Sequence, residues 1–221
     1  MRGYVALAAG VACVAFASAA SATDLSVPAP INPDRFYVSF HGGYVFSSVT
    51  NDRTTPATVD SIAYGAPGYR VGGAFGKEIG SNFALEGELS YASSAIASAV
   101  TTGGIPIAPV SGSGSMLTGM INGYLAGDMG AFRPYIGAGI GAGYFTANNI
   151  KASAATLNGS TTGFAAQFLA GVDFAVAENI SLGGRYRYLY VTGLSLPDGG
   201  FTHTFNIATQ SVEVVLTTKW Q

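Results

Sequence analysis

The 221-residue sequence is poor in charged residues. Aspartate, glutamate, lysine and arginine make up 10% of it, against roughly 25% in an ordinary soluble domain. This is too little charge to cover the surface of a cytosolic globule. The formal net charge is −2, so no basic field indicates a nucleic-acid partner. Hydrophobic residues make up 48%, which excludes an intrinsically disordered chain.

Cysteine is nearly absent, because Cys13 is the only one. It lies in a segment that resembles a secretory signal, with Arg2 at the start and an apolar core over Val5–Ala17. Small residues at Ala20 and Ala22 fit the signal-peptidase rule. We therefore expect residues 1–22 to be removed between Ala22 and Thr23.

The mature chain then has no thiol, which excludes disulfides and cysteine-based metal sites. Its first part, residues 23–34, is rich in proline and is expected to be an extended periplasmic leader. A docking segment for a periplasmic partner is the alternative interpretation. Residues 35–221 are expected to form one β-barrel domain.

Long hydrophobic runs are also missing, since no apolar run after the signal reaches the roughly 18 residues that a membrane helix needs. Apolar residues recur instead with period two, which is typical of strands. Val212, Val214 and Leu216, for example, alternate with Ser211 and Glu213. The same alternation occurs in 36–46, 83–91 and 180–190.

Glycine is abundant, and one run of it separates helix from strand. Gly137, Gly139, Gly141 and Gly143 lie two residues apart. In a helix each would cost roughly 0.8–1 kcal/mol relative to alanine. In a strand all of them fall on one face, which suits a crowded interior that other strands fill with bulky side chains.

The pattern predicts eight strands, separated by connections that alternate between short and long. The strands are expected at about 35–47, 68–78, 83–92, 115–126, 134–145, 162–175, 180–190 and 205–220. Short connections are expected at 79–82, 127–133 and 176–179, and long loops at 48–67, 93–114, 146–161 and 191–204. This asymmetry is typical of an all-β, eight-stranded, antiparallel, up-and-down transmembrane β-barrel in a bacterial outer membrane.

Aromatic residues gather near the expected strand ends, as the two girdles of such a barrel require. A soluble barrel with an aromatic core is the alternative. The girdle residues are Phe36, Phe46, Tyr69, Phe83, Tyr91, Tyr135, Tyr144, Phe174, Tyr190 and Trp220.

Three stretches resemble a known family. They are Phe36–Tyr44 (FYVSFHGGY), Pro134–Tyr144 (PYIGAGIGAGY) and Ala175–Tyr188 (AVAENISLGGRYRY). The chain resembles small outer-membrane β-barrel proteins of the opacity and surface-antigen type, related to the OmpA membrane domain. The resemblance implies an eight-stranded barrel, an outer-membrane location, and roles in envelope integrity or surface contact.

Family members usually end on an aromatic residue that the barrel-insertion machinery reads. Here Trp220 is expected to be that C-terminal insertion signal, although Gln221 follows it. The last expected strand leaves no length for a peptidoglycan-binding domain, so we do not expect tethering to the cell wall.

The residues give little indication of catalysis. His41 lies beside glycines in a strand, and His203 lies between threonines near the last strand. We see no carboxylate cluster beside either histidine, and we expect lumen or rim positions for both. The chain is therefore predicted not to be an enzyme, and no cofactor or metal is expected.

Charged residues do fall on the polar faces of three expected strands, where outward placement in hydrocarbon would be costly. We predict that they form an ion-pair network across the narrow lumen, joined by Lys219 and Glu213 of the last strand. The alternative is a wet lumen with separate charges. The network residues are Glu86, Glu88, Asp173, Arg185 and Arg187.

Two functions remain open. The first is a structural or surface-interaction role, in which external loops contact an unknown surface ligand and the barrel contacts outer-membrane lipid. The second is a porin-like narrow pore for small solutes or hydrophobic molecules. A large pore needs sixteen or more strands, which this chain cannot supply.

Overall fold

The computed structural model describes residues 35–55, 61–152, 155–198 and 200–221. The expected signal peptide, its cleavage site and the leader lie outside these residues. In the described ranges, no helix is long and apolar enough to cross a membrane. The strands are β1 (Phe36–Thr55), β2 (Ser61–Gly65), β3 (Gly68–Ile79), β4 (Phe83–Thr101), β5 (Pro106–Ile107), β6 (Val110–Ala126), β7 (Phe132–Ala152), β8 (Ala155–Ala177), β9 (Ile180–Asp198) and β10 (Phe201–Trp220).

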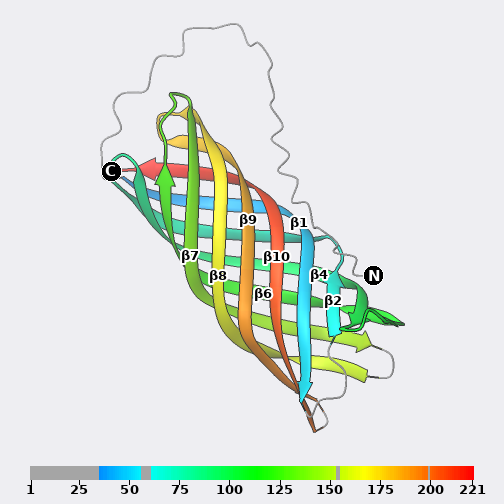
Figure 1. Ribbon diagram of the computed structural model, residues 1–221. Coiled ribbons are helices and arrows are strands. Elements are labelled where there is room, and N and C mark those ends of the chain that lie inside the picture. The colour runs from blue at the N-terminus through cyan, green and yellow to red at the C-terminus, as the bar shows by residue number, and fades with distance from the viewer. Residues whose placement is uncertain (1–34, 56–60, 153–154, 199) are drawn as a thin grey trace, which may run out of the picture.

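The long strands close into a barrel. Each pairs antiparallel with the next long strand along the chain, from β1 through β3, β4, β6, β7, β8 and β9 to β10. β10 then pairs back with β1, with Trp220 opposite Phe36 (Figure 1). The predicted eight-stranded up-and-down barrel is thus confirmed over the described residues, and closure gives each of the eight long strands a paired neighbour on both sides. The short β2 lies between β1 and β4, and β5 pairs with β4.

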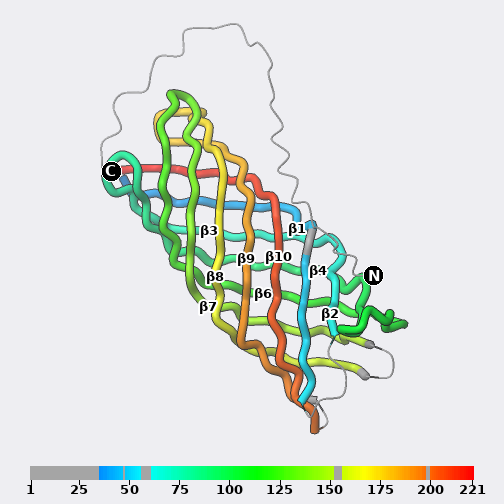
Figure 2. Tube along the Cα trace, viewed as in Figure 1, coloured from blue at the N-terminus to red at the C-terminus, as the bar shows by residue number. Residues whose placement is uncertain are grey.

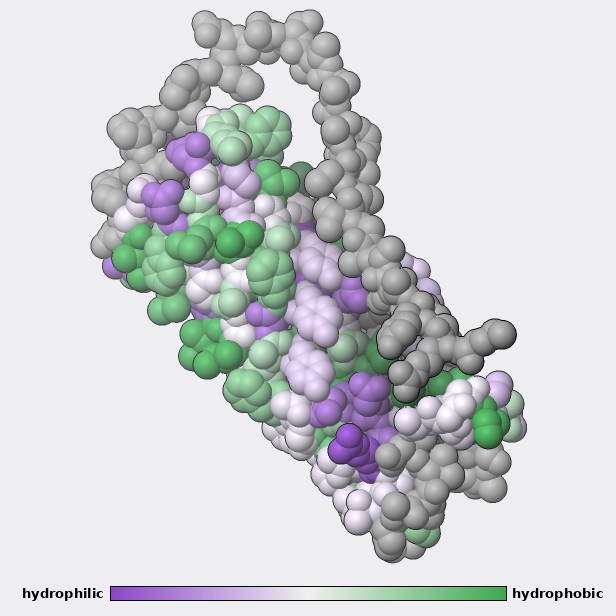
Figure 3. Space-filling view, viewed as in Figure 1, coloured by the Kyte–Doolittle hydropathy of each residue, from purple (hydrophilic) through white to green (hydrophobic). Residues whose placement is uncertain are grey.

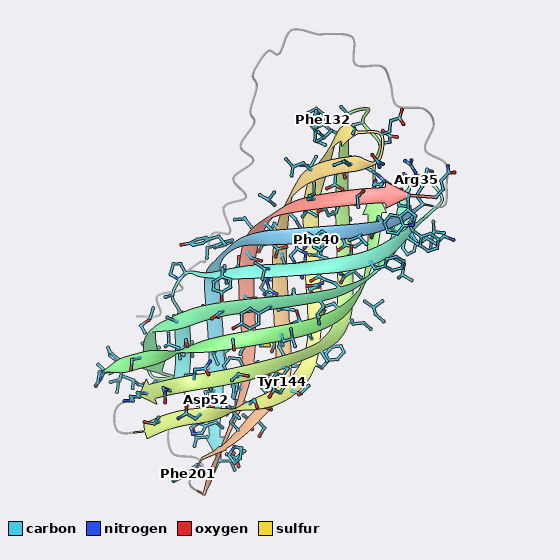
Figure 4. All side chains as sticks on the ribbon, turned by 180° about the vertical axis from the view of Figure 1, so that it is seen from behind. Arg35, Phe40, Asp52, Phe132, Tyr144 and Phe201 are labelled. Atoms are coloured by element: carbon cyan, nitrogen blue, oxygen red, sulfur yellow. The ribbon has the colours of Figure 1, made fainter. Side chains whose placement is uncertain are left out.

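The two ends of the barrel differ. The start of β1 and the C-terminus lie together at one end, which we call the terminal end (Figure 2). Short turns join strands there, at 80–82, 127–131 and 178–179, as predicted. The opposite, distal end holds the remaining hairpins, and Figure 4 shows Asp52 and Phe201 there, far from Arg35.

The expected long distal loops are largely wrong, because the strands continue through them. β1 runs to Thr55 rather than 47, and its pairing with β10 persists through Thr50–Ile207 and Thr54–His203. β4, β7 and β9 likewise extend to Thr101, Ala152 and Asp198. These segments are rich in Thr, Ser and Ala, a composition that predicts loops. In the structure they instead continue the β-pairing of the adjacent strands.

Near the terminal end, side chains follow the alternation expected for a barrel in lipid. Leu85, Ile140, Val172 and Val214 point outward, with exposed fractions of 47%, 61%, 42% and 59%. Figure 3 shows hydrophobic residues spread over this outer wall. The outer surface of this part of the barrel is therefore apolar enough to contact the hydrocarbon core of a bilayer.

Toward the distal end the alternation inverts. Leu194, Leu196, Phe205 and Ile207 point inward and are at most 4% exposed. Polar residues such as Ser195 and Thr204 point outward there. The terminal part of the barrel is built for lipid outside, and the distal part is built like a soluble barrel for water outside.

The glycine-lined face of β7 lies inside, as predicted, because bulky neighbours fill the space. A Cβ atom on Gly139 would lie 1.9 Å from Asn122 Oδ1, and one on Gly137 would lie 2.4 Å from the Tyr124 ring. Tyr135 shares this inner face and packs edge-on against Tyr124, with 5.6 Å between ring centroids. Its predicted place in the outer aromatic girdle is therefore wrong.

Candidate functional site: an ion-pair plug and an apolar chamber

Arg187 on β9 lies at the centre of the lumen with its side chain 0% exposed. Its Nη1 donates to Glu88 Oε1 on β4 at 2.5 Å, and its Nε donates to Glu213 Oε1 on β10 at 2.8 Å. Nη1 also donates to Gln167 Oε1 on β8 at 2.5 Å. One guanidinium thus links β9 to its neighbours β8 and β10 and, across the lumen, to β4.

Arg185, two residues earlier on the same face, donates from Nη2 to Glu213 Oε2 at 2.7 Å. Glu86 contacts neutral donors instead: Tyr124 Oη at 2.8 Å, Asn122 Nδ2 at 3.0 Å and Tyr37 Oη at 3.2 Å. The amide of Asn122 also donates to Glu88 Oε2 at 3.2 Å, which joins the two carboxylates into one cluster.

Arg70 on β3 belongs to this cluster, although sequence reasoning missed it. It is 0% exposed, its Nε lies 3.6 Å from Glu213 Oε1, and it donates to Ser90 Oγ and Thr209 Oγ1 at 3.1 and 3.2 Å. The signal was present, because Arg70 alternates with the outward Tyr69 and Val71. We call the set of Arg70, Glu86, Glu88, Arg185, Arg187 and Glu213 the ion-pair plug.

Asp173 and Lys219 lie outside the plug, at the mouth of the terminal end. Lys219 Nζ donates to Glu78 Oε1 at 2.9 Å, and Arg133 binds the same oxygen. Asp173 lines the small cavity beside them. Lys219, Arg133 and Glu78 form what we call the mouth cluster.

The two histidines occupy a lumen and a rim position. His41 is buried beside the plug, with Nε2 at 3.4 Å from Arg187 Nη2 and 3.9 Å from Glu88 Oε1. His203 lies near the distal rim, with Nδ1 at 2.9 Å from Asp52 Oδ2. Each histidine thus has one carboxylate nearby, which comes from another strand and could not be paired with it from the sequence.

An apolar chamber lies on the distal side of the plug. It is a cavity of about 170 Å³ bounded by residues that include Met116, Phe145, Phe205 and Ile207. Thr209 also lines it and accepts the hydrogen bond from Arg70, so the plug lies directly beneath the floor of the chamber. No pattern of polar residues along the strands predicts this chamber, so it could not be found from the sequence.

Trp220 ends β10 at the terminal end and is 41% exposed. Its ring lies 6.2 Å from that of Phe75. This placement leaves the residue on the outer wall. Its role in insertion stays a prediction.

The described residues contain no group of three or more His, Cys, Asp and Glu that is arranged to hold a metal ion. The contacts that His203 does make fall on Nδ1, so among the described residues no nucleophile reaches its Nε2. What the described residues do show is a set of buried charge pairs and an apolar cavity.

The family model for the outer membrane protein beta-barrel domain matches residues 6–210. A comparison with curated proteins gives no match. Among solved structures, the outer membrane protein OprG from Pseudomonas aeruginosa is similar with a TM-score of 0.52 and 13% identity, over 86% of this chain and 96% of OprG. Neisserial surface protein A has a TM-score of 0.48 and 17% identity, over 81% of this chain and 95% of its own. The likeness to OprG agrees with the barrel fold.

Proposed function

This chain belongs to the outer membrane protein beta-barrel domain family, and from that premise we propose that it is a closed, non-conducting barrel with a structural or surface-contact role. Its location is the bacterial outer membrane. In this family of architectures short turns face the periplasm, so the terminal end is periplasmic and the distal end is external.

The observation that carries the proposal is the ion-pair plug. Arg187, Glu88 and Glu213 have side chains that are 0% exposed, and they come from the neighbouring strands β9 and β10 and from β4 on the opposite wall. The interior of an eight-stranded barrel is just wide enough for side chains to fill. A paired and desolvated cluster at this narrow point blocks a continuous water path.

The external part supports the surface-contact role. The strands continue beyond the lipid-matched wall, so they hold the distal hairpins on a paired framework. Outward polar residues and an inward apolar core suit this part to water. A rigid stem of this kind presents hairpin tips to a partner at low cost in conformational entropy.

Conductance of the refolded barrel in a planar bilayer tests the proposal. We expect the parent to be silent and Arg187→Ala to show openings. The matched control Arg53→Ala removes an exposed arginine of the distal part of β1 and should stay silent. Steady openings of the parent would contradict a closed barrel.

The apolar chamber favours a second candidate function, which is the binding of a small hydrophobic molecule from the outside. An apolar cavity of about 150 Å³ is enough to hold a benzene ring, so the chamber has the right size for one ring or a short chain. Because the plug lies directly beneath the floor of the chamber, a guest would be held rather than passed through. Saturable uptake of toluene by barrel-containing nanodiscs, above that of empty nanodiscs, is the expected result.

A further inference from the structure

The chamber carries one ion pair in an otherwise mostly apolar lining. Asp52 on β1 and His203 on β10 both line the cavity and are about one-fifth exposed. Their neighbours on the same inner faces include Phe205 and Ile207, which are buried. Placing polar side chains in an apolar cavity costs free energy unless they are hydrogen-bonded. The hydrogen bonds of this pair therefore show which of its atoms remain available to a guest.

The pair fixes the imidazole through one nitrogen. Asp52 Oδ2 lies 2.9 Å from His203 Nδ1, and Thr54 Oγ1 lies 3.5 Å from the same atom. In the neutral imidazole, a carboxylate at this distance holds the proton on Nδ1, which leaves Nε2 with its lone pair as an acceptor. Within the part of the chain that the structure describes, no hydrogen-bond partner of Nε2 is found.

We propose that the chamber binds a small amphiphile, namely a single ring or short chain with one hydroxyl group, and that His203 Nε2 accepts the hydrogen bond of this hydroxyl. The proposal rests on the second candidate function and adds the polar contact to it. The volume of the chamber limits the size of the guest's ring or chain. Asp52, by holding the proton on Nδ1, makes His203 Nε2 the acceptor of the contact. A carboxylate guest is disfavoured, since it would face both the Nε2 lone pair and the nearby Asp52 charge.

The test compares guests that differ only in the polar group. 4-Methylphenol, toluene and 4-methylbenzoate are titrated into the full barrel in phosphatidylcholine nanodiscs, and empty nanodiscs correct for partitioning into lipid. We expect 4-methylphenol to bind about tenfold more tightly than toluene, and 4-methylbenzoate to bind weakest.

Variants assign the contact to His203. His203→Leu should reduce the affinity for 4-methylphenol about tenfold and change that for toluene less than twofold. Thr50→Val removes another polar group of the same lining and is the matched control, expected to change neither guest. Ala99→Phe should fill the cavity and abolish both, and gel mobility before boiling verifies that each variant is folded.

The outcomes separate the two proposals. If no guest binds above the level of empty nanodiscs, the chamber has no guest and both ideas fall. If toluene binds but 4-methylphenol gains nothing, or if His203→Leu weakens both guests equally, the chamber stands and the hydroxyl contact is refuted. Preferred binding of 4-methylbenzoate would likewise overturn the proposed polarity.

Discussion

Arg187 and Glu88 are 99 positions apart in the chain, yet Arg187 Nη1 lies 2.5 Å from Glu88 Oε1 in the middle of the lumen. Both side chains are 0% exposed, so their charges are removed from water and depend on each other. Such a pair adds little net stability, because desolvation offsets the attraction between the charges. Removing one partner is expected to lower stability strongly, because it leaves the other charge buried and unpaired.

The first prediction concerns that loss. Arg187→Ala leaves Glu88 and Glu213 without their central cation, and we expect the free energy of unfolding to fall by about 3–5 kcal/mol. Urea unfolding in detergent micelles measures it. Arg53→Ala, at an exposed arginine, should change stability by less than about 0.5 kcal/mol.

A double change tests the pairing itself. Arg187→Gln combined with Glu88→Gln should be more stable than Arg187→Gln alone. The second change removes the buried Glu88 charge that Arg187→Gln leaves without its partner. Glu86→Gln should give no such recovery, since Glu86 is held by Tyr37, Tyr124 and Asn122. Recovery by Glu86→Gln instead would mean that the partners are misassigned.

Sequence periodicity could predict which side chains enter the lumen, but not which of them meet. The period of two follows from strand geometry alone, so the inward faces of β4 and β9 could be predicted from the sequence. The meeting of Glu88 with Arg187 depends on the stagger of all intervening strands, which no local pattern encodes. Asp173 illustrates the limit, because it shares the inner face yet lies at the mouth rather than in the plug.

The distal half could be predicted less well, because its polarity reverses. Leu194, Leu196, Phe205 and Ile207 alternate as strand residues do, but they face inward. A rule made for lipid-exposed walls assigns apolar residues to the outside, and it reads their polar neighbours as loops. The chamber arises from this reversal, so it was hidden from the same rule.

The second prediction concerns the lipid-facing wall. Ile140→Arg places a charge on an outward position that is 61% exposed, and we expect a loss of about 2–4 kcal/mol in lipid. Thr156→Arg, on the external part of β8, is the control and should cost little, since that position is exposed on the water-facing part of the barrel. Equal tolerance at both positions in refolding titrations would mean that the membrane span is misplaced.

The third prediction uses a matched pair of glycines. A Cβ on Gly141 would lie 2.0 Å from the backbone oxygen of Gly119, whereas a Cβ on Gly119 meets nothing within 4 Å. Gly141→Ala should therefore destabilise the barrel by about 1–3 kcal/mol. Gly119→Ala should be neutral or stabilising by up to about 1 kcal/mol, because it reduces the freedom of the unfolded chain. Melting temperatures of the two variants decide it.

The fourth prediction concerns export. The small residues Ala20 and Ala22 fit the peptidase pocket, so the mature protein should begin at Thr23. Intact mass spectrometry of the protein from an outer-membrane fraction measures this start. Protein in that fraction that still carries Met1 would refute cleavage.

The fifth prediction concerns the independence of the mouth cluster from the plug. Lys219 Nζ lies 2.9 Å from Glu78 Oε1, and Arg133 contacts the same carboxylate, so Lys219→Met leaves Glu78 with a cation. The Lys219 side chain is also 16% exposed, so water screens the change. We expect a loss of about 1 kcal/mol, clearly smaller than that of Arg187→Ala.

Among the described residues no ion pair or hydrogen bond joins the two clusters, so the effects of Lys219→Met and Arg187→Ala should add within about 0.5 kcal/mol in the double variant. A charge-preserving control, Lys219→Arg, should stay close to the parent. Additivity would mean that the two clusters act independently, with the mouth cluster joining β3, β7 and β10 at the terminal end. A coupling of more than about 1 kcal/mol would instead mean that one electrostatic network runs from the mouth to the floor of the chamber.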